Sequence, residues 1–148
     1  MKLSPKKIIG RIERVDLPLW DISDIEAKID TGAFTSSVHC NKIEEIIING
    51  QPYVHFNLLD SKHPSYNDQI IELPIHDKRD VKSSNGYSSL RIFIQTEIRI
   101  FDQNYIIQLS LTNRSEMKFP LLIGRKFLKK RFVVDVSEKN LSQKHKRK

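Results

Sequence analysis

The sequence predicts an all-β domain, either a closed barrel or a sandwich. Seven to nine short β-type segments follow one another at regular spacing, and turn residues separate them. Little helical periodicity interrupts this pattern, and there is no internal repeat at the periods typical of solenoids or propellers. The chain of 148 residues is long enough for one domain with a hydrophobic core, because domains commonly have about 100–200 residues.

The first half of the chain contains five expected strands and one strong turn signal. Asn49 and Gly50 form the dipeptide that most strongly predicts a two-residue hairpin turn. The segment before Asp30 is short and apolar, and it leads into a glycine. The expected strands of this half are residues 8–15, 25–29, 45–48, 53–59 and 70–75.

The second half adds four expected strands and one helical turn. Residues 119–123 form a continuous apolar run, as a buried strand would, and residues 125–130 are expected to form a short helix. A short turn is expected at residues 102–104. Alternating positions of the strand before that turn share one face, namely Ile92, Ile94, Thr96, Ile98 and Ile100. The expected strands are residues 92–101, 105–111, 119–123 and 132–136.

Charge divides the chain into an acidic middle and two basic ends. The formal net charge of +7 at first indicates nucleic-acid binding. However, residues 125–148 hold ten Lys or Arg and two acidic residues, whereas residues 15–124 hold ten basic and fifteen acidic residues. Nucleic acid is therefore an alternative partner and not the favoured one. We expect a single domain over residues 1–141 and a basic, disordered tail over residues 142–148, which contain no apolar residue.

Three features of the sequence indicate a cytoplasmic protein. No apolar run approaches the roughly 18 residues of a membrane-spanning helix, so no membrane association is expected. Residues 1–10 carry three lysines and lack the apolar core of a secretory signal. The single cysteine, Cys40, cannot form an internal disulfide, which suits a reducing compartment.

Asp30, Thr31 and Gly32 follow an apolar strand and form the most informative segment of the sequence. Asp-Thr-Gly is the motif that activates water in aspartic peptidases, where the aspartate at the end of a strand faces a second carboxylate. The glycine lets its backbone N–H approach the carboxylate, and the threonine hydroxyl can hydrogen-bond across to a matching loop. The motif is also an ordinary turn sequence, so it indicates catalysis only in combination with other segments.

Two further segments follow the motif in the order found in retroviral proteases. Residues 81–89 form a small, polar, glycine-containing loop between β-type flanks, similar to the flap hairpin that closes over the substrate in those enzymes. Residues 120–125, Pro-Leu-Leu-Ile-Gly-Arg, resemble their Ile-Ile-Gly-Arg element. Over about residues 8–136, the chain therefore resembles the retropepsin-like aspartic peptidase family.

Within that family, the chain is most similar to a bacterial and archaeal branch labelled as an ATP-dependent zinc protease. The segments specific to the branch are residues 10–13 (Gly-Arg-Ile-Glu), residues 28–39, and the stretch from Arg114 to Asp135. The resemblance implies a closed β-barrel with one short helix near the C-terminus. Members of the branch are linked to enzymes that ligate glutamate onto ribosomal protein tails, so the resemblance also implies an acidic protein tail as substrate.

The same resemblance implies roles for individual residues. Asp30, Thr31 and Gly32 are expected to be catalytic, and Gly124 and Arg125 are expected to support the site. For Arg125 we favour an ion pair with a neighbouring carboxylate that serves stability alone, and the alternative is that the same pair orients the active-site loop. The residues expected to bind substrate lie in the loop and the flap, namely Ala33, Ser83, Ser84, Gly86 and Arg91. For Ser83, Ser84 and Arg91, the alternative is that they are solvated flap residues without a substrate contact.

The chain contains one Asp-Thr-Gly and no second copy of it. Aspartic peptidase chemistry requires two carboxylates about 3 Å apart that share one proton. We therefore expect a C2 homodimer with Asp30 of each subunit at the two-fold axis, because such an interface brings the same residue against itself. Asp135 is a disfavoured partner within one chain, since no glycine follows it to let the backbone pack.

The sequence does not support the zinc or the ATP of the branch label. His-Glu-x-x-His is absent, and the five histidines lack the spacing of ligands on a helix. The adjacent His39 and Cys40 are too few for a structural zinc site, which normally has four ligands in recognisable pairs. No Gly-x-x-x-x-Gly-Lys-Ser/Thr motif for phosphate binding occurs. We therefore expect neither a metal nor a cofactor.

Three other functions stay open from the sequence. A non-catalytic β-barrel could bind RNA or the ribosome through its basic ends, of which residues 144–148 are one. A module that binds a ligase partner would keep the same fold without turnover. Ser36, Ser37 and His39 suggest a serine nucleophile, but no aspartate lies at a meaningful spacing from them.

Overall fold

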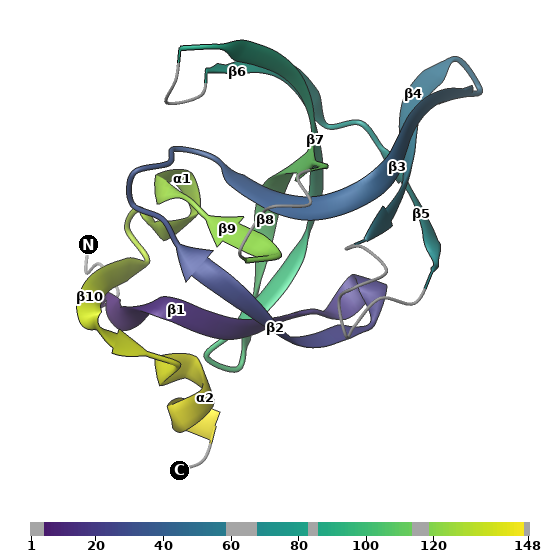
Figure 1. Cartoon of the computed structure of the whole chain (residues 1–148). Coiled ribbons are helices and arrows are strands. Elements are labelled where there is room, and N and C mark those ends of the chain that lie inside the picture. The colour runs from purple at the N-terminus through teal and green to yellow at the C-terminus, as the bar shows by residue number, and fades with distance from the viewer. Residues whose placement is uncertain (1–4, 59–67, 83–85, 114–118, 147–148) are drawn as a thin grey trace.

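Ten strands and three short helical segments form the part of the chain that the computed structural model describes, residues 5–58, 68–82, 86–113 and 119–146 (Figure 1). The strands are β1 (Lys7–Leu17), β2 (Ile22–Ile29), β3 (Ser36–Ile48), β4 (Gln51–Leu58), β5 (Ile70–Pro74), β6 (Asp77–Lys82), β7 (Ser88–Ile100), β8 (Gln103–Thr112), β9 (Leu121–Ile123) and β10 (Phe132–Lys139). The helical segments are the 3-10 turn η1 (Pro18–Trp20) and the helices α1 (Arg125–Leu128) and α2 (Leu141–Lys146). No helix in these ranges is long and apolar enough to cross a membrane.

Six of the strands close into a barrel in the order β1-β2-β9-β3-β8-β7, and pairing of Asp16 in β1 with Arg99 in β7 completes the ring. The short strand β9 lies between β2 and β3, parallel to the first and antiparallel to the second. β10 adds to β1 as a parallel outer strand, and β4 and β5 extend from the far half of β3. In Figure 1 the hairpin of β6 and β7 arches over the top of the molecule, while α2 lies at the bottom. The prediction of an all-β domain is confirmed, and the domain is a closed barrel.

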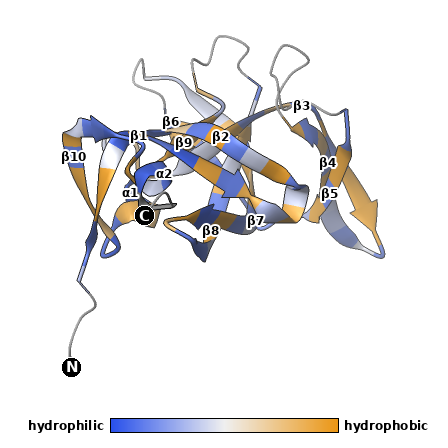
Figure 2. Ribbon diagram, turned by 90° about the horizontal axis from the view of Figure 1, so that it is seen from below, coloured by the Kyte–Doolittle hydropathy of each residue, from blue (hydrophilic) through white to orange (hydrophobic). Residues whose placement is uncertain are grey.

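Alternate side chains of the strands fill the barrel. In β7, Ile94, Ile98 and Ile100 are buried, as the period-two pattern predicts. The ends of β9 are also buried, since Leu121 and Ile123 are fully shielded from solvent. Figure 2 shows the resulting alternation of hydrophilic and hydrophobic residues along the strands. This packing fixes the ends of β2 and β9, from which the Asp-Thr-Gly and Gly-Arg segments continue.

Two tight turns follow from the chemistry of their residues. Asn49 and Gly50 adopt φ of 50° and 77° and join β3 to β4, which confirms the predicted hairpin. The turn between β7 and β8 consists of Phe101 and Asp102, with φ of 53° and 60°. It therefore begins one residue before the turn expected at residues 102–104.

The sequence pattern does not predict β6 or the first half of β3. Five of the six residues in β6 are charged, so the strand has no apolar alternation. It exists because its backbone pairs with β7 along its whole length, from Asp77 opposite Phe93 to Lys82 opposite Ser88. The expected loop at residues 81–89 is consequently shorter, because its flanks belong to these two strands.

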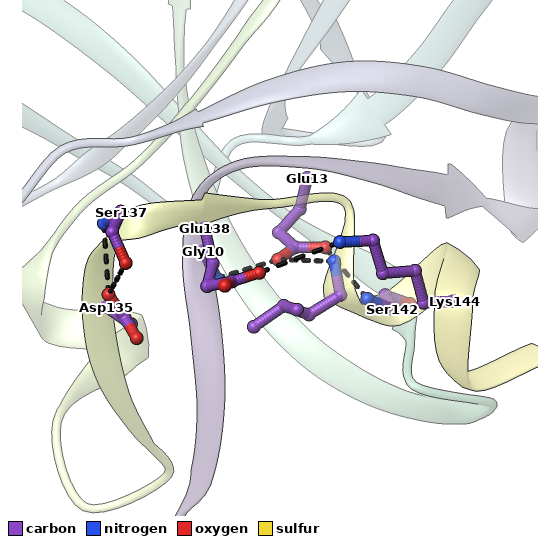
Figure 3. A network of polar contacts seen from close by, with 8 residues as sticks. Gly10, Glu13, Asp135, Ser137, Glu138, Ser142 and Lys144 are labelled. Carbon is purple, nitrogen blue, oxygen red and sulfur yellow. Dashed lines mark hydrogen bonds and ion pairs between the residues drawn. The ribbon is translucent and has the colours of Figure 1, made fainter.

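The C-terminal segment folds back as α2, so residues 142–146, expected to begin a disordered tail, are helical. The fully buried carboxylate of Glu13 accepts hydrogen bonds from the N–H groups of Gly10, Leu141 and Ser142 at 2.7, 3.2 and 3.0 Å (Figure 3). The Ser142 hydroxyl in turn accepts a bond from the N–H of Phe101 at 2.8 Å. Near the C-terminus there are thus two short helices where one was expected, and a buried carboxylate anchors the second.

Candidate active site

Asp30 lies at the carboxyl end of β2, where that strand runs beside β9. Ile29 pairs with Ile123 in the parallel register of these strands, and the N–H of Asp30 donates to the Ile123 carbonyl at 2.8 Å. The backbone of Asp30 is therefore fixed by the barrel, while its side chain is only half-buried. A carboxylate in this position can reach both solvent and a bound substrate.

The loop after β2 turns tightly around this carboxylate. The Gly32 N–H donates to Oδ1 of Asp30 at 3.1 Å, and the Ala33 N–H donates to its carbonyl oxygen at 3.2 Å. A Cβ atom at position 32 would lie 3.3 Å from the same Oδ1, which is closer than side-chain carbons ordinarily approach. Glycine thus lets the N–H approach and orient the carboxylate without crowding it.

Gly124, directly after β9, allows the chain to pass close behind this loop. Its N–H donates to the Ser36 hydroxyl at 3.0 Å, in a buried position. A Cβ atom at position 124 would lie 2.5 Å from the Thr35 carbonyl oxygen and 2.8 Å from that of Ala33. Only glycine fits at this crossing without displacement of the backbone.

Arg125 contacts the same loop through both its backbone and its side chain. The N–H of Arg125 donates to the Ala33 carbonyl at 2.8 Å, and Nη1 donates to the Thr31 carbonyl at 2.9 Å. The guanidinium group also lies 5.8 Å from the centre of the Phe34 ring. The segment from β9 into α1 therefore holds the Asp-Thr-Gly loop at several points.

A cleft of about 670 Å³ opens between this loop and the hairpin of β6 and β7. Asp30, Gly32 and Ala33 line it from the loop. Three cationic residues line it from the hairpin, namely Arg79, Lys82 and Arg91. The half-buried carboxylate of Asp30 thus faces a space that is large enough for part of an extended peptide and that carries several positive charges.

The structure brings together most of the residues expected at the site. Asp30, Gly32, Ala33 and Arg91 line the cleft, and Gly124 lies behind the loop. Two others line a second groove, which shares Phe34 with the cleft, namely Thr31 and Arg125. Gly86 is exposed in the β6–β7 hairpin with φ of 90°. Ser83 and Ser84 lie outside the described residues.

Sequence reasoning missed Arg79 and Phe93, which also line the cleft, and it considered Ser37, a third lining residue, only for serine chemistry. Arg79 was missed because the charged segment from Asp77 to Lys82 lacks the apolar alternation of a strand. Its pairing with β7 could have been found from the hairpin geometry, since two strands on either side of a short loop ordinarily pair residue by residue.

Asp135 lies outside the cleft. Its Oδ1 accepts bonds from the Ser137 hydroxyl at 2.6 Å and from the Ser137 N–H at 3.0 Å (Figure 3). The hydroxyl, and then the N–H, lower the pKa of Asp135. Among the described residues, Asp80 is the other carboxylate that lines the cleft beside Asp30, and it is exposed on β6.

Metal binding and serine chemistry were the other chemistries considered from the sequence, and the residues concerned lie as follows. No group of three or more His, Cys, Asp or Glu residues within the described ranges is arranged to hold a metal ion. Cys40 is buried, and burial raises the pKa of its thiol to about 12. The Ser36 hydroxyl accepts a bond from Gly124, and Ser36 and His39, three residues apart, point to opposite faces of β3.

Comparison with known proteins agrees with this geometry. The model of a family described as RimB-like, "Retropepsin-like aspartic endopeptidase RimB", matches residues 8–145. Among solved structures, the fold is similar to the crystal structure of Lpg0085, a protein of unknown function (DUF785) from Legionella pneumophila, with a TM-score of 0.76 and 28% identity. That similarity covers 93% of this chain and 99% of the other. The resemblance expected from the sequence is confirmed.

The curated relatives are longer proteins. The chain is 36% identical over 137 residues to a protein named probable alpha-L-glutamate ligase from Shewanella pealeana. It is 35% identical over 134 residues to one of the same name from Desulfotalea psychrophila. These matches cover 90% and 88% of this chain but 29% and 28% of those proteins. The chain thus spans less than a third of the length of the curated relatives that it matches.

Proposed function

We propose that this chain, which belongs to the RimB-like family of retropepsin-like aspartic endopeptidases, hydrolyses peptide bonds as a homodimer. One observation carries the proposal: the Gly32 N–H orients a half-buried Asp30 carboxylate at the mouth of the cleft. A carboxylate fixed by the barrel but open to a substrate is what general acid–base catalysis requires.

In the proposed mechanism, the two Asp30 carboxylates of a dimer share one proton. The ionised carboxylate removes a proton from a water molecule, whose oxygen attacks the carbonyl carbon of the scissile bond. The protonated carboxyl group donates its proton to the carbonyl oxygen. The carboxyl group that took the proton from water then donates it to the leaving nitrogen, and the C–N bond breaks as the other carboxylate takes back the proton from the former carbonyl oxygen.

The second carboxylate comes from a second copy, since the sequence holds one Asp-Thr-Gly. We infer that the two-fold axis passes beside Thr31, because both Asp30 residues must meet there. Two features support this position: the Phe34 side chain next to the loop is 52% exposed, and an apolar groove of about 500 Å³ adjoins it. Leu128, Phe132 and Val134 line this groove, and its burial by a partner would remove apolar surface from water.

We infer that the substrate is a glutamate-rich protein tail. The curated relatives are named probable alpha-L-glutamate ligases, and the region they share with this chain is a small part of their length. A peptidase that removes glutamate residues would undo the modification that such a ligase makes. The positive charges along the cleft favour a substrate of this kind.

Comparison of Asp30→Asn with Asp135→Asn tests the proposal. Cleavage of an oligoglutamate peptide is followed by mass spectrometry, and dimer formation by sedimentation velocity. We expect Asp30→Asn to lower the rate by roughly 10²–10⁴-fold while folding and dimerisation persist, and Asp135→Asn to retain activity. Equal loss in both variants would contradict the assignment of catalysis to Asp30, because Asp135 lies outside the cleft. Absence of cleavage by the unmodified protein, together with salt-sensitive RNA binding, would favour the non-catalytic alternative.

A further inference from the structure

Two arginines lie directly opposite each other on the hairpin that covers the cleft. Arg79 of β6 is the register partner of Arg91 of β7, and both line the cleft with Asp30. Opposed residues of an antiparallel pair point to the same face of the sheet. In β6, Arg79 is half-buried, whereas its neighbour Asp80 is exposed. The two arginines therefore share one face of the hairpin and both line the cleft, which Asp80 also lines.

Opposed like charges ordinarily destabilise a β-sheet. Asp77 offsets part of this repulsion, because its carboxylate pairs with Nε of Arg79 at 2.8 Å. A guanidinium group has five N–H donors in a planar fork, so this one contact uses a small part of the capacity of Arg79. The Cβ atoms of directly opposed residues are about 4.5–5.5 Å apart, which lets two guanidinium groups approach the same carboxylate.

The guanidinium group of Arg79 is held in place before any ligand arrives. Its Cζ lies 4.0 Å from the centre of the Phe93 ring. That ring is itself 1% exposed, so it provides a fixed surface for stacking. Since less side-chain entropy is lost when an ordered group binds, this arrangement favours a specific anion site.

We propose that Arg79 and Arg91 bind a side-chain carboxylate of the substrate near the scissile bond, and are therefore specificity-determining residues for acidic peptides. The inference rests on the proposed function in assuming that the cleft with Asp30 holds the substrate. Two planar guanidinium groups match a carboxylate, which accepts hydrogen bonds on both oxygens. They match a neutral amide less well, because its NH₂ group cannot accept. Glutamate is accordingly preferred to glutamine at the same substrate position.

Binding is measured in the Asp30→Asn protein, so that cleavage cannot interfere. The probes are fluorescein-labelled oligoglutamate and oligoglutamine peptides, followed by fluorescence anisotropy. Arg79→Gln and Arg91→Gln are each expected to weaken oligoglutamate binding by roughly 10–100-fold, the loss expected for a charge-assisted hydrogen bond. Arg99→Gln, on the same strand as Arg91 but outside the cleft, removes an equal charge and is expected to leave binding unchanged.

In the protein with Asp30 intact, the same two changes are expected to raise KM for an oligoglutamate substrate with little effect on kcat. Arg79→Lys and Arg91→Lys keep the charge without the fork, and we expect them to bind with intermediate strength. Circular dichroism confirms that each variant is folded. A glutamine variant that has lost its fold is replaced by the lysine variant at the same position, which keeps the charge.

The outcomes separate this inference from the proposed function. Loss of oligoglutamate binding in both glutamine variants supports the arginine pair even if no peptide is ever cleaved. Unchanged binding in those variants overturns the proposed role of the two arginines, even if the unmodified protein is an active peptidase. Equal affinity for oligoglutamate and oligoglutamine also overturns it. So does binding of a labelled RNA oligonucleotide by a protein that binds neither peptide.

Discussion

Arg125 donates a hydrogen bond from Nη1 to the carbonyl oxygen of Thr31 at 2.9 Å, across 94 positions of the sequence. Its own N–H reaches the Ala33 carbonyl at 2.8 Å, so one residue holds both sides of Gly32. The position of Asp30 thus depends on a residue that follows β9 and does not line the cleft. Arg125 is a positioning residue in the proposed mechanism.

Replacement of Arg125 by lysine should therefore reduce catalysis more than stability. Lysine keeps the charge but lacks the planar fork that reaches the Thr31 carbonyl while it lies near Phe34. We expect kcat to fall roughly tenfold, which corresponds to about 1.4 kcal/mol, with a small change in melting temperature. The control is Arg14→Lys, which affects an exposed ion pair with Asp24. Equal effects of Arg125→Lys on kcat and on melting temperature would argue for a purely structural arginine.

Gly124→Ala should destabilise the fold through a backbone clash. The added Cβ would lie 2.5 Å from the Thr35 carbonyl oxygen, and the φ of −96° at this position is accessible to alanine. The cost is thus steric, and we expect about 1–3 kcal/mol in the free energy of unfolding by urea. Gly50→Ala serves as the comparison, because nothing lies within 4 Å there but φ is 77°. A stability equal to that of the unmodified protein would show that β3 or β9 moves to make room.

Glu13→Gln should release α2 from the barrel while leaving the barrel folded. The carboxylate of Glu13 accepts three backbone N–H groups, whereas an amide has one oxygen and would turn its NH₂ group toward a donor. We expect faster hydrogen exchange at Leu141 and Ser142, since an unsatisfied buried donor costs about 1–3 kcal/mol. Glu26→Gln, which affects an exposed ion pair with Arg14, should leave exchange in α2 unaltered. Unaltered exchange in Glu13→Gln would mean that packing, and not the carboxylate, holds the helix.

The sequence was most informative where local chemistry determines structure. The Asn49-Gly50 turn, the alternation of β7 and the apolar β9 each follow from the residues themselves. The position of Asp30 at the end of a strand could be predicted for the same reason. By contrast, β6 is a strand only because β7 pairs with it, and its sequence carries no strand pattern. Arg79 was therefore missed, since its position in the cleft depends on that pairing.

The helix α2 was not predicted from the sequence, for a related reason. Residues 142–148 read as a solvated tail because they contain no apolar residue. Their helical part is held by polar contacts with Glu13 and Phe101, which are far away in the sequence. No local pattern reports a partner more than a hundred positions away, and a buried polar network is satisfied only once the barrel has formed.

Cys40 gives a prediction about stability at high pH. Burial raises the pKa of its thiol to about 12, and a hydrogen bond from the Thr112 backbone offsets only part of that shift. In the unfolded chain, the thiol ionises near pH 8.5. Between that pH and about 12, the unfolded chain releases a proton that the folded protein retains. By linkage, the free energy of unfolding then falls as pH rises, by up to about 1.4 kcal/mol per pH unit, and the thiol has no such effect below about pH 8.

The measurement is the free energy of unfolding by urea, from about pH 7 to pH 11, for the protein and for Cys40→Ala. Tyrosine and lysine side chains titrate in both proteins over this range, so the difference between the two curves isolates the thiol. Alanine at position 40 leaves a small cavity whose cost does not depend on pH. The advantage of the unmodified protein over Cys40→Ala should therefore be constant up to about pH 8 and shrink steadily above it. A difference that stays constant to pH 11 would mean that the folded protein ionises this thiol as readily as the unfolded chain, and that β3 opens to solvent around it.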